Sequence, residues 1–251
     1  HIKFGAFYDK LPSLGSYDKI ATGHYAQVFE KDNKFYLKTS PDLIKDQTYF
    51  LARLSQEQLS RALFPIGHLT KPALRELAQE FDLPTKNRKD SQGICFLGKL
   101  KYSEFIKFHV GEKVGNLVEF ETGKKLGTHK GFWFYTIGQR QGTGLSGGPW
   151  YVVKKDTEIN TVFISRNYYT DGMQRDTLVI ENCNWISDAP KENKQLFVKL
   201  RHGQFGHMCE LIILGQDRFM LKLSSNDQGI SPGQFAVLYD GEICLGSGVI
   251  S

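Results

Sequence analysis

Cysteine is scarce in this sequence. Only four cysteines occur among 251 residues, and no two are spaced as a Cys-x-x-Cys pair. A count this low excludes a disulfide-stapled scaffold, and no histidines accompany the cysteines at the spacing of a zinc site. We therefore expect a reducing compartment, no bound metal, and one candidate reactive thiol among Cys95, Cys183, Cys209 and Cys244.

Long apolar runs are absent as well. No stretch approaches the ~20 residues of a membrane-spanning helix, and no basic start with a following apolar segment marks a secretion signal. On these grounds the sequence predicts no membrane partner. The chain begins at His1 instead of Met, so we expect either that a segment has been removed or that the numbering starts inside a longer protein.

Positive charge exceeds negative charge only slightly. Lysine and arginine total 32 against 27 acidic residues, a net charge of +5, and the pI is near 8.9. This balance permits a nucleic-acid partner without requiring one. Hydrophobic residues make up 40% of the chain, which suffices for a core and argues against disorder. At ~150 residues per domain, the length predicts one large or two modest domains.

The residue pattern in the first third of the chain predicts mostly helices. A hairpin is expected around Asp32 and Asn33, with strands at 27–30 and 34–38. Helices are expected at residues 46–54, 55–63, 70–81 and, after a loop, 102–109. The second starts at a capping box formed by Ser55 and Gln58, and the third presents Leu74, Leu77 and Phe81 at a spacing that favours burial.

From about residue 113 the pattern changes to short alternating strands separated by turn residues. A first set is expected at residues 116–120, 131–137, 150–154 and 161–165. A second set, typical of a small barrel, is expected at residues 177–181, 195–201, 208–214, 219–224, 234–239 and 243–250.

Cys95 differs from the other three cysteines in its neighbours. It follows Lys86, Arg88 and Lys89, and nearby cations lower the pKa of a thiol. Gly93 leaves the backbone free to approach a ligand. A buried and inert cysteine between two apolar residues is the competing interpretation, which the local pattern by itself favours. The other three cysteines lie inside predicted strands and are interpreted as structural.

Several polar motifs are weak candidates for ligand contacts. Thr22-Gly23-His24-Tyr25 follows an apolar step, as at a strand end in a nucleotide-binding domain, and Lys45-Asp46-Gln47 precedes a helix. Taken alone, the first motif is better explained as a plain turn and the second as helix capping by Asp46 with a solvated Lys45. Basic clusters at Lys124, Lys125, His129 and Lys130, at Arg140, and at Arg201-His202 would together suit a folded RNA, although a solvated face is the default for each.

Taken in order, the motifs resemble a known family. The series consists of Ile2-Lys3-Phe4, Ala21-Thr22-Gly23-His24-Tyr25, Lys45-Asp46-Gln47-Thr48-Tyr49-Phe50-Leu51, Phe64-Pro65-Ile66-Gly67, Lys89-Asp90-Ser91-Gln92-Gly93-Ile94-Cys95-Phe96, Leu126-Gly127-Thr128-His129-Lys130-Gly131, Thr136-Ile137-Gly138-Gln139-Arg140, Pro149-Trp150-Tyr151-Val152-Val153, Pro232-Gly233-Gln234 and Cys244-Leu245-Gly246-Ser247-Gly248. It closely resembles the tRNA-specific 2-thiouridylases, the MnmA/TrmU family, over essentially the whole chain.

The resemblance implies a reaction. Family members replace the C2 oxygen of the wobble uridine of certain tRNAs with sulfur, giving 2-thiouridine. Mg-dependent ATP, a co-substrate, adenylates that oxygen, and a cysteine persulfide then supplies sulfur to the activated carbon. A second catalytic cysteine assists release and can form a disulfide with the first.

The resemblance also implies roles for particular residues. Cys95 matches the persulfide-bearing cysteine, and Gly23 matches a position that contacts ATP. Positions that match tRNA contacts are His24, Lys45, Asp46, Gln47, Arg201, His202 and Gln234.

The implied fold class is multidomain α/β plus β. The C-terminal part of an adenine-nucleotide α-hydrolase-like (PP-loop) domain is expected at residues 1–97, a central β-rich tRNA-binding domain at 98–170, and a C-terminal β-barrel at 171–251. The implied partners are wobble-uridine tRNAs and a sulfur-carrier or cysteine-desulfurase relay protein. A monomer is expected, in the cytoplasm or, in a eukaryote, in a mitochondrial or plastid matrix.

The chain departs from the family at its start. The family's Ser-Gly-Gly-x-Asp-Ser pyrophosphate loop is absent, and its first catalytic cysteine would lie immediately upstream of His1. We therefore expect a truncated chain that cannot adenylate tRNA by itself. Two alternatives stay open: a non-catalytic tRNA-binding module, and a cysteine-dependent hydrolase, for which no sequence signal identifies a histidine base.

Overall fold

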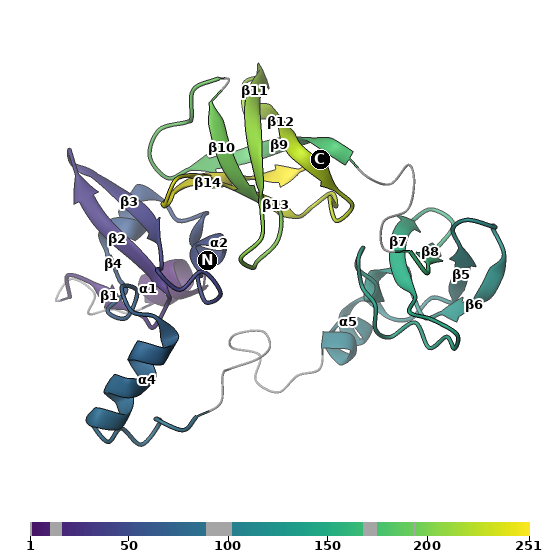
Figure 1. Ribbon diagram of the computed structural model, residues 1–251, viewed down its shortest axis with the longest axis horizontal. Coiled ribbons are helices and arrows are strands. Elements are labelled where there is room, and N and C mark those ends of the chain that lie inside the picture. The colour runs from purple at the N-terminus through teal and green to yellow at the C-terminus, as the bar shows by residue number, and fades with distance from the viewer. Residues whose placement is uncertain (1, 11–16, 89–101, 168–174, 193) are drawn as a thin grey trace. The chain divides into compact units, whose positions relative to one another are not determined.

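The computed structural model describes residues 2–10, 17–88, 102–167, 175–192 and 194–251 (Figure 1). The chain divides into two compact units. The first comprises residues 1–88, 176–225 and 230–251, and the second comprises residues 89–175 and 226–229. Among the described residues, no helix combines the length and the apolar character that crossing a membrane requires.

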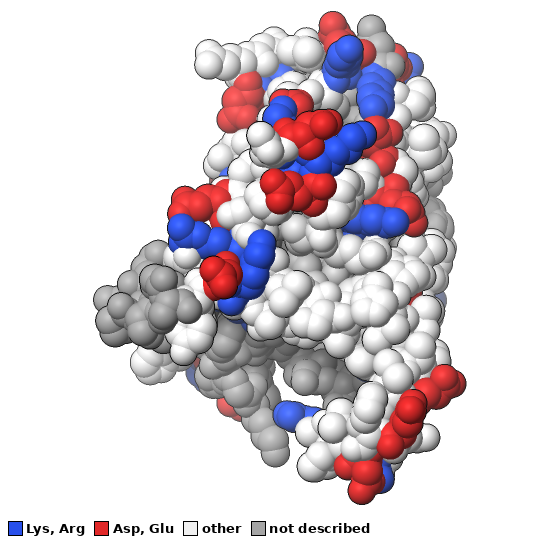
Figure 2. All heavy atoms as spheres, turned by 90° about the vertical axis from the view of Figure 1, so that its left-hand side faces the viewer, with Lys and Arg blue, Asp and Glu red and all other residues white. Residues whose placement is uncertain are grey.

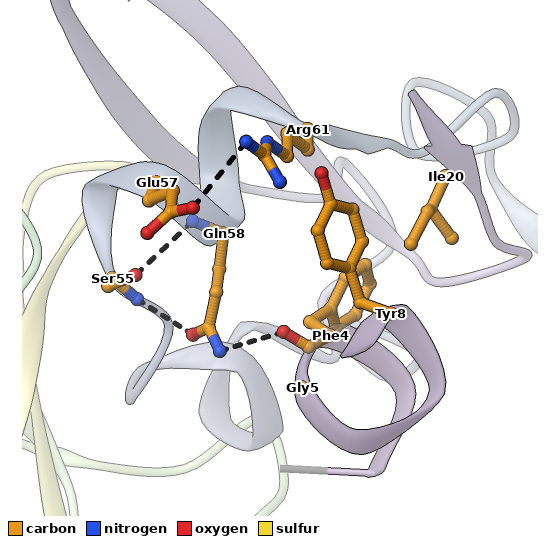
Figure 3. A pocket seen from close by; sticks show the side chains of 8 residues that line it. All are labelled: Phe4, Gly5, Tyr8, Ile20, Ser55, Glu57, Gln58 and Arg61. Atoms are coloured by element: carbon orange, nitrogen blue, oxygen red, sulfur yellow. Dashed lines mark hydrogen bonds and ion pairs between the residues drawn. The ribbon is translucent and has the colours of Figure 1, made fainter. Parts of the chain in front are cut away.

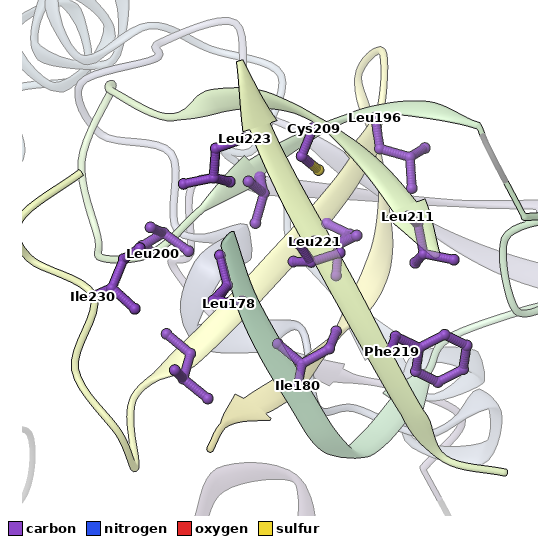
Figure 4. Packing of buried hydrophobic residues seen from close by; sticks show 14 residues of the cluster. Leu178, Ile180, Leu196, Leu200, Cys209, Leu211, Phe219, Leu221, Leu223 and Ile230 are labelled. Carbon is purple, nitrogen blue, oxygen red and sulfur yellow. The ribbon is translucent and has the colours of Figure 1, made fainter. Parts of the chain in front are cut away.

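Six strands of the first unit close into a barrel. They are β9 (Arg175–Trp185), β10 (Gln195–Lys199), β11 (His207–Gly215), β12 (Arg218–Asp227), β13 (Phe235–Asp240) and β14 (Ile243–Ile250). These six strands pair in the order β13-β10-β11-β12-β9-β14. Because β13 also pairs with β14, the first and last strands of this order meet and the barrel closes. The predicted small barrel is thereby confirmed. Its interior is filled by alternate side chains of these strands, including Leu178, Ile180, Leu196, Leu211 and Leu221 (Figure 4).

A hairpin from the first third extends the barrel sheet. β2 (Ala26–Lys31) and β3 (Lys34–Thr39) are joined by Asp32 and Asn33, whose φ angles of 54° and 58° suit a tight two-residue turn. The hairpin predicted from the sequence is confirmed. β3 pairs with β14 through Leu37 opposite Cys244, so one sheet runs from the barrel into the hairpin (Figure 1).

Short helical elements make up most of the rest of the first third. They are η1 (Ile2–Ala6), α1 (Phe7–Lys10), α2 (Thr48–Leu51), α3 (Gln56–Ser60) and α4 (Lys71–Glu80), with a parallel pair of short strands, β1 (Ile20–Ala21) and β4 (Ala62–Leu63). The predicted capping box before α3 is confirmed, because Ser55 and Gln58 exchange side-chain and backbone bonds. The long helix predicted at residues 46–54 is wrong, since Gln47 has a non-helical backbone and only Thr48–Leu51 is helical.

Helix α4 is less buried than the sequence predicts. Thr70 caps it as expected, with Pro72 in the first turn. None of the residues of α4 is buried, and Phe81 at its end is 68% exposed. The prediction that Leu74, Leu77 and Phe81 are buried is therefore wrong. Helical spacing determines which side chains share a face, but it does not determine whether another element covers that face.

The first third packs on the outside of the barrel. A second core combines Leu37, Leu51, Leu54 and Leu59 with side chains of the barrel wall, namely Ile186, Val237, Tyr239 and Cys244. Along β10, Leu196 and Val198 face the barrel interior, whereas Phe197 packs against this second core. The outer face of β10 and β13 is thus a buried contact surface.

The second unit is a small mixed sheet with one helix. It contains α5 (Tyr102–Val110), β5 (Gly115–Glu119), β6 (Lys125–His129), η3 (Phe132–Phe134), β7 (Tyr151–Asp156) and β8 (Thr161–Ser165), with strand order β6-β5-β8-β7. Leu117, Tyr135, Trp150, Val152 and Ile164 belong to its core.

One strand of the second unit was assigned to the wrong residues. The prediction of a strand at 131–137 is wrong, because Gly131 has a φ of 142° and residues 132–134 form a 3₁₀ turn. The backbone N–H of Tyr135 bonds back to the carbonyl of Phe132 instead of to a neighbouring strand. The strand lies at Lys125–His129, in a stretch that the sequence presents only as a basic cluster.

Candidate functional site

Asp46 and Lys199 form a buried ion pair in the first unit. The Lys199 Nζ lies 3.1 Å from Asp46 Oδ2, and the two side chains are only 6% and 0% exposed. Thr48 donates its hydroxyl to the same oxygen at 2.7 Å, and the backbone N–H of Ser40 donates to Oδ1 at 3.2 Å. Because its carboxylate is enclosed and satisfied, Asp46 organises the loop before α2 rather than presenting charge to solvent.

Two tyrosines extend this contact between α2 and the barrel. The Thr48 hydroxyl lies 3.1 Å from the hydroxyl of Tyr239 on β13. The hydroxyl of Tyr49 donates to the carbonyl of Phe235 at 3.0 Å. Burial raises the pKa of Tyr49, and the positive charge of nearby Arg201 opposes that shift. Helix α2 is thus held on the barrel wall by hydrogen bonds on both sides of the ion pair.

His202 lies directly beside the 45–47 segment. Its Nε2 is 3.2 Å from the backbone carbonyl oxygen of Asp46. Since a carbonyl only accepts, Nε2 must carry the proton and donate. The His202 ring stacks on Phe50 of α2, with 4.6 Å between ring centroids and an angle of 26° between planes. Arg201 and His202 are both exposed.

Gln47 joins this segment to the strand that begins after His24. Its backbone N–H donates to the carbonyl of Tyr25 at 2.9 Å, and its side-chain oxygen accepts from the Tyr25 N–H at 3.0 Å. Lys45 is half-buried, and its backbone N–H bonds to Asp42. The structure therefore brings Lys45, Asp46 and Gln47 together with His202, which the sequence could suggest only through the resemblance.

His24 is buried, with both ring nitrogens engaged. Lys3 donates to Nε2 at 3.1 Å, so Nδ1 carries the proton and donates to the Thr22 hydroxyl at 2.7 Å. Burial and the charge of Lys3 lower the pKa of His24 to about 4. Near neutral pH the imidazole is uncharged. His24 therefore shapes the backbone beside Gly23 and does not supply a positive charge to a phosphate.

Gly23 and Gly67 lie near this site, and the missing side chain has a different consequence at each position. Gly23 is exposed, and a Cβ there would meet only the Ile66 side chain, at 3.8 Å. Its backbone is thus accessible to a ligand. At Gly67 a Cβ would lie 1.6 Å from the Ala26 carbonyl oxygen. The Gly67 backbone therefore supports the strand behind His24, a role that the sequence motif did not reveal.

Gln234 lies at the turn before β13, on the barrel. Its carbonyl accepts from the Ile250 N–H at 2.8 Å, and its side chain is half-buried. It is next in sequence to Phe235, whose carbonyl accepts the Tyr49 hydroxyl. Gln234 is therefore linked to the α2 contact through its neighbour.

The described cysteines are poor nucleophiles. Burial raises the pKa of Cys183 to about 12, with the neighbouring carboxylate of Asp217 adding to the shift, and burial raises that of Cys209 to about 12. Cys244 is completely enclosed, and burial raises its pKa as well. A thiol needs its thiolate form to react. Cys95, the candidate reactive thiol, lies outside the described residues.

The first unit also contains a pocket that none of the predicted site residues lines. It encloses about 180 Å³ and is lined by Phe4, Gly5, Tyr8, Ile20, Ser55, Glu57, Gln58 and Arg61 (Figure 3). The Arg61 guanidinium pairs with Glu57 at 3.5 Å and lies over the ring of Tyr8. The Arg61 cation thus already has an anionic partner, and none of the residues predicted to contact ligand lines this pocket.

Positive charge is not concentrated on the face shown in Figure 2. Among the described residues there, Lys and Arg alternate with Asp and Glu (Figure 2). In the first unit, the barrel residues Asp188 and Glu242 neutralise the hairpin lysines Lys34 and Lys38. In the second unit, Glu112 lies close to Lys107 and Lys130. His129 is buried there, so its assignment to an exposed basic cluster is wrong.

The described residues hold no cluster of three or more His, Cys, Asp or Glu side chains placed to bind a metal ion. The arrangement is instead an exposed aromatic and basic surface, formed by Phe50, Arg201 and His202 with the half-buried Lys45 nearby in sequence, beside a buried ion pair. The resemblance had identified Asp46 but not its partner Lys199. The only sequence signal for Lys199 is a charged residue inside a predicted strand.

Three family models match the chain in order. They are described as the tRNA methyl transferase HUP domain at residues 1–99, the tRNA methyl transferase PRC-barrel domain at residues 103–166, and the aminomethyltransferase beta-barrel domain at residues 175–250. Together with the closed barrel, these matches confirm the predicted fold class of an α/β domain followed by two β modules.

Curated relatives match over the whole chain. The tRNA-specific 2-thiouridylase MnmA 1 of Bacteroides thetaiotaomicron is 44% identical over 256 residues, covering 100% of this chain and 72% of the relative. The MnmA proteins of Parabacteroides distasonis and Porphyromonas gingivalis are also 44% identical, over 257 and 261 residues, covering 100% of this chain and 71% of each relative. By this similarity, and as its ordered motifs indicate, the chain belongs to the tRNA-specific 2-thiouridylase (MnmA/TrmU) family.

Proposed function

We propose that this chain acts in the 2-thiolation of tRNA. The relatives are named for that activity, and the match extends over the entire chain. The observation that carries the proposal is the 3.2 Å contact between His202 Nε2 and the Asp46 carbonyl. It joins two segments that are far apart in sequence and that the family resemblance independently assigns to tRNA.

In this proposal some site residues contact the RNA, and others hold the contacting residues in position. Lys45, Arg201 and His202 contact the RNA, because their side chains reach the surface beside α2. Gln47 and Gln234 contribute from the edges of the same surface. Asp46 and His24 are positioning residues, since both are buried and hydrogen-bonded within the protein. Gly23 offers accessible backbone to ATP, which reacts as its magnesium complex.

The proposed chemistry takes place on the uridine base. ATP activates the C2 oxygen by adenylation, with release of pyrophosphate. The outer sulfur of a Cys95 persulfide then bonds to C2, and AMP departs with the oxygen. A second thiol attacks the Cys95 sulfur, which leaves one sulfur on the uridine and forms a protein disulfide that a cellular thiol reduces. The persulfide reacts as an anion, which the basic residues preceding Cys95 favour.

The proposed partners follow from this chemistry. A persulfide must be loaded from a sulfur-carrier or cysteine-desulfurase relay protein, and the tRNA must carry a wobble uridine. We propose a bacterial cytoplasmic setting, since the relatives are bacterial and the thiols must stay reduced. A monomer suffices for the proposed binding surface, because Lys45, Arg201 and His202 come from one compact unit.

A nucleoside assay tests the proposal. The enzyme containing this chain is incubated with unmodified wobble-uridine tRNA, Mg-ATP and a sulfur donor, and the digested nucleosides are analysed by mass spectrometry. We expect 2-thiouridine, dependent on ATP, and its loss in the Cys95→Ser variant with tRNA affinity retained within a few-fold. Sulfur transfer by Cys95→Ser would remove Cys95 from the mechanism. A methylated uridine, or tRNA binding without any product, would contradict the proposed reaction.

The same assay tests the 251 residues alone. The absence of the pyrophosphate loop from this sequence predicts no ATP-dependent product, and that expectation stays a prediction. Product formed by these residues alone would show it to be wrong. Tight tRNA binding without product would agree with the alternative of a tRNA-binding module.

A further inference from the structure

Phe50 lies exposed beside the predicted tRNA contacts. It is 62% exposed, although Thr48 and Leu51 of the same helical turn are buried. An isolated exposed phenylalanine is common on protein surfaces and needs no explanation. Phe50 is not isolated, because its ring stacks on His202, which comes from the loop after β10.

The stack is held in place by buried interactions. His202 donates from Nε2 to the Asp46 carbonyl, and the Asp46 side chain is paired with Lys199 in the interior. The rings of Tyr49 and Phe50 are perpendicular neighbours, with centroids 5.7 Å apart and planes at 89°. The orientation of Phe50 is therefore set before any ligand binds, which lowers the entropic cost of binding.

The exposed part of Phe50 suits a flat aromatic ligand. One face of the ring is stacked on His202, and the side chain nonetheless keeps 62% of its area exposed. Arg201 adjoins the stack, and its charge acts on Tyr49. An aromatic face next to a cation is the arrangement on which unpaired nucleobases stack in single-stranded RNA recognition, with the phosphate close to the positive charge.

We propose that Phe50, supported from behind by His202, is a stacking platform for an unpaired base of the bound tRNA. The inference rests on the proposed function and adds a residue and a mode of contact to it. Its occupant is RNA, because an exposed aromatic ring close to the charge of Arg201 suits a base together with its phosphate.

Binding of unmodified wobble-uridine tRNA to Phe50 variants tests the platform. Phe50→Ala should weaken affinity about 5- to 100-fold, as expected for loss of one base stack. The slope of log affinity against log salt should stay unchanged, because no phosphate contact is lost. Phe50→Trp should restore affinity, whereas Phe50→Leu should not, since only an aromatic ring stacks. Thermal unfolding of each variant verifies that the fold is retained.

Phe29 provides a matched control. It is stacked on Tyr36 of the hairpin, with ring centroids 5.3 Å apart, and is 38% exposed. Phe29→Ala removes a similar surface stack away from the predicted contacts and should change tRNA affinity less than about twofold, well below the loss expected for a base stack.

The outcomes separate the platform from the proposed function. If Phe50→Ala binds as tightly as Phe29→Ala while Arg201→Ala binds weakly, the platform is disproved and the tRNA surface stands. If Phe50→Ala binds tRNA normally but slows sulfur loading from the donor protein, Phe50 contacts a protein, and the proposal is also disproved. If the unaltered enzyme does not bind tRNA, the proposed function fails first.

Discussion

Lys199 on β10 and Asp46 in the loop before α2 form an ion pair with an N–O distance of 3.1 Å and with both side chains almost entirely enclosed. The pair joins the barrel to the first third of the chain. It also lies directly beneath the carbonyl that orients His202. The contact between the barrel and the first third, and the orientation of His202, therefore depend on the same segment.

Replacing Lys199 by methionine should destabilise the first unit strongly. The substitution leaves the Asp46 carboxylate buried without its cation, which costs about 3 to 5 kcal/mol in comparable sites. The double variant Lys199→Met with Asp46→Asn should recover part of that loss, because no charge is then stranded. Urea unfolding measures the effect. Lys34→Ala, which breaks the exposed pair with Asp188, is the control and should shift the midpoint far less.

Stability should fall in mild acid because of His24. Its pKa is about 4 in the folded chain, lowered by burial and Lys3 from a usual value of 6.5. Below 6.5 the unfolded chain binds this proton while the folded chain does not, so unfolding is favoured progressively until the pH reaches about 4. We expect a loss of about 1 to 2 kcal/mol between about pH 7.5 and pH 5, allowing for screening.

The substitution His24→Gln isolates that contribution. Glutamine does not titrate, so the difference in unfolding free energy between the two pH values should shrink by about 1 to 2 kcal/mol. An unchanged pH dependence in His24→Gln would mean that other groups cause the loss.

The three described cysteines should resist alkylation in the folded chain. Burial raises the pKa of Cys183 and Cys209 to about 12 and raises that of Cys244, so little thiolate exists at neutral pH. Iodoacetamide labelling followed by peptide mass spectrometry should show slow modification until urea is added. The sequence predicts faster modification of Cys95, which follows basic residues. Equal rates at all four positions would contradict both expectations.

Arg201 should contribute to tRNA affinity through charge. Replacing it with alanine should weaken binding and reduce the slope of log affinity against log salt by about 1, as for the loss of one phosphate contact. Arg218→Ala is the control, because its exposed guanidinium already pairs with Glu181 at 2.9 Å. Filter binding at several salt concentrations distinguishes the two. An unchanged slope in Arg201→Ala would place Arg201 outside the phosphate-binding surface.

Local features were predicted best where the physical cause is local. The Asp32–Asn33 turn and the capping box of Ser55 and Gln58 depend on neighbouring residues alone, and both are confirmed. The residues 131–137 were misassigned because aromatic alternation resembles a strand, whereas the backbone of Gly131 starts a 3₁₀ turn. His129 was assigned to a basic surface because its type, and not its burial, is visible in a sequence.

The amino-acid sequence by itself determined the family, the order of α-rich and β-rich segments, and the alternation that builds the barrel, because these follow from motif order and from periodicity. Only the tertiary structure decided what the candidate residues do. Asp46 and His24 are buried and bonded within the protein, so their side chains hold neighbouring segments in place. Folding also brings Lys199 against the Asp46 carboxylate, which comes from a distant segment. Stacking on His202 leaves Phe50 displayed at the surface. Charge and exposure depend on neighbours brought together by folding, which periodicity does not encode.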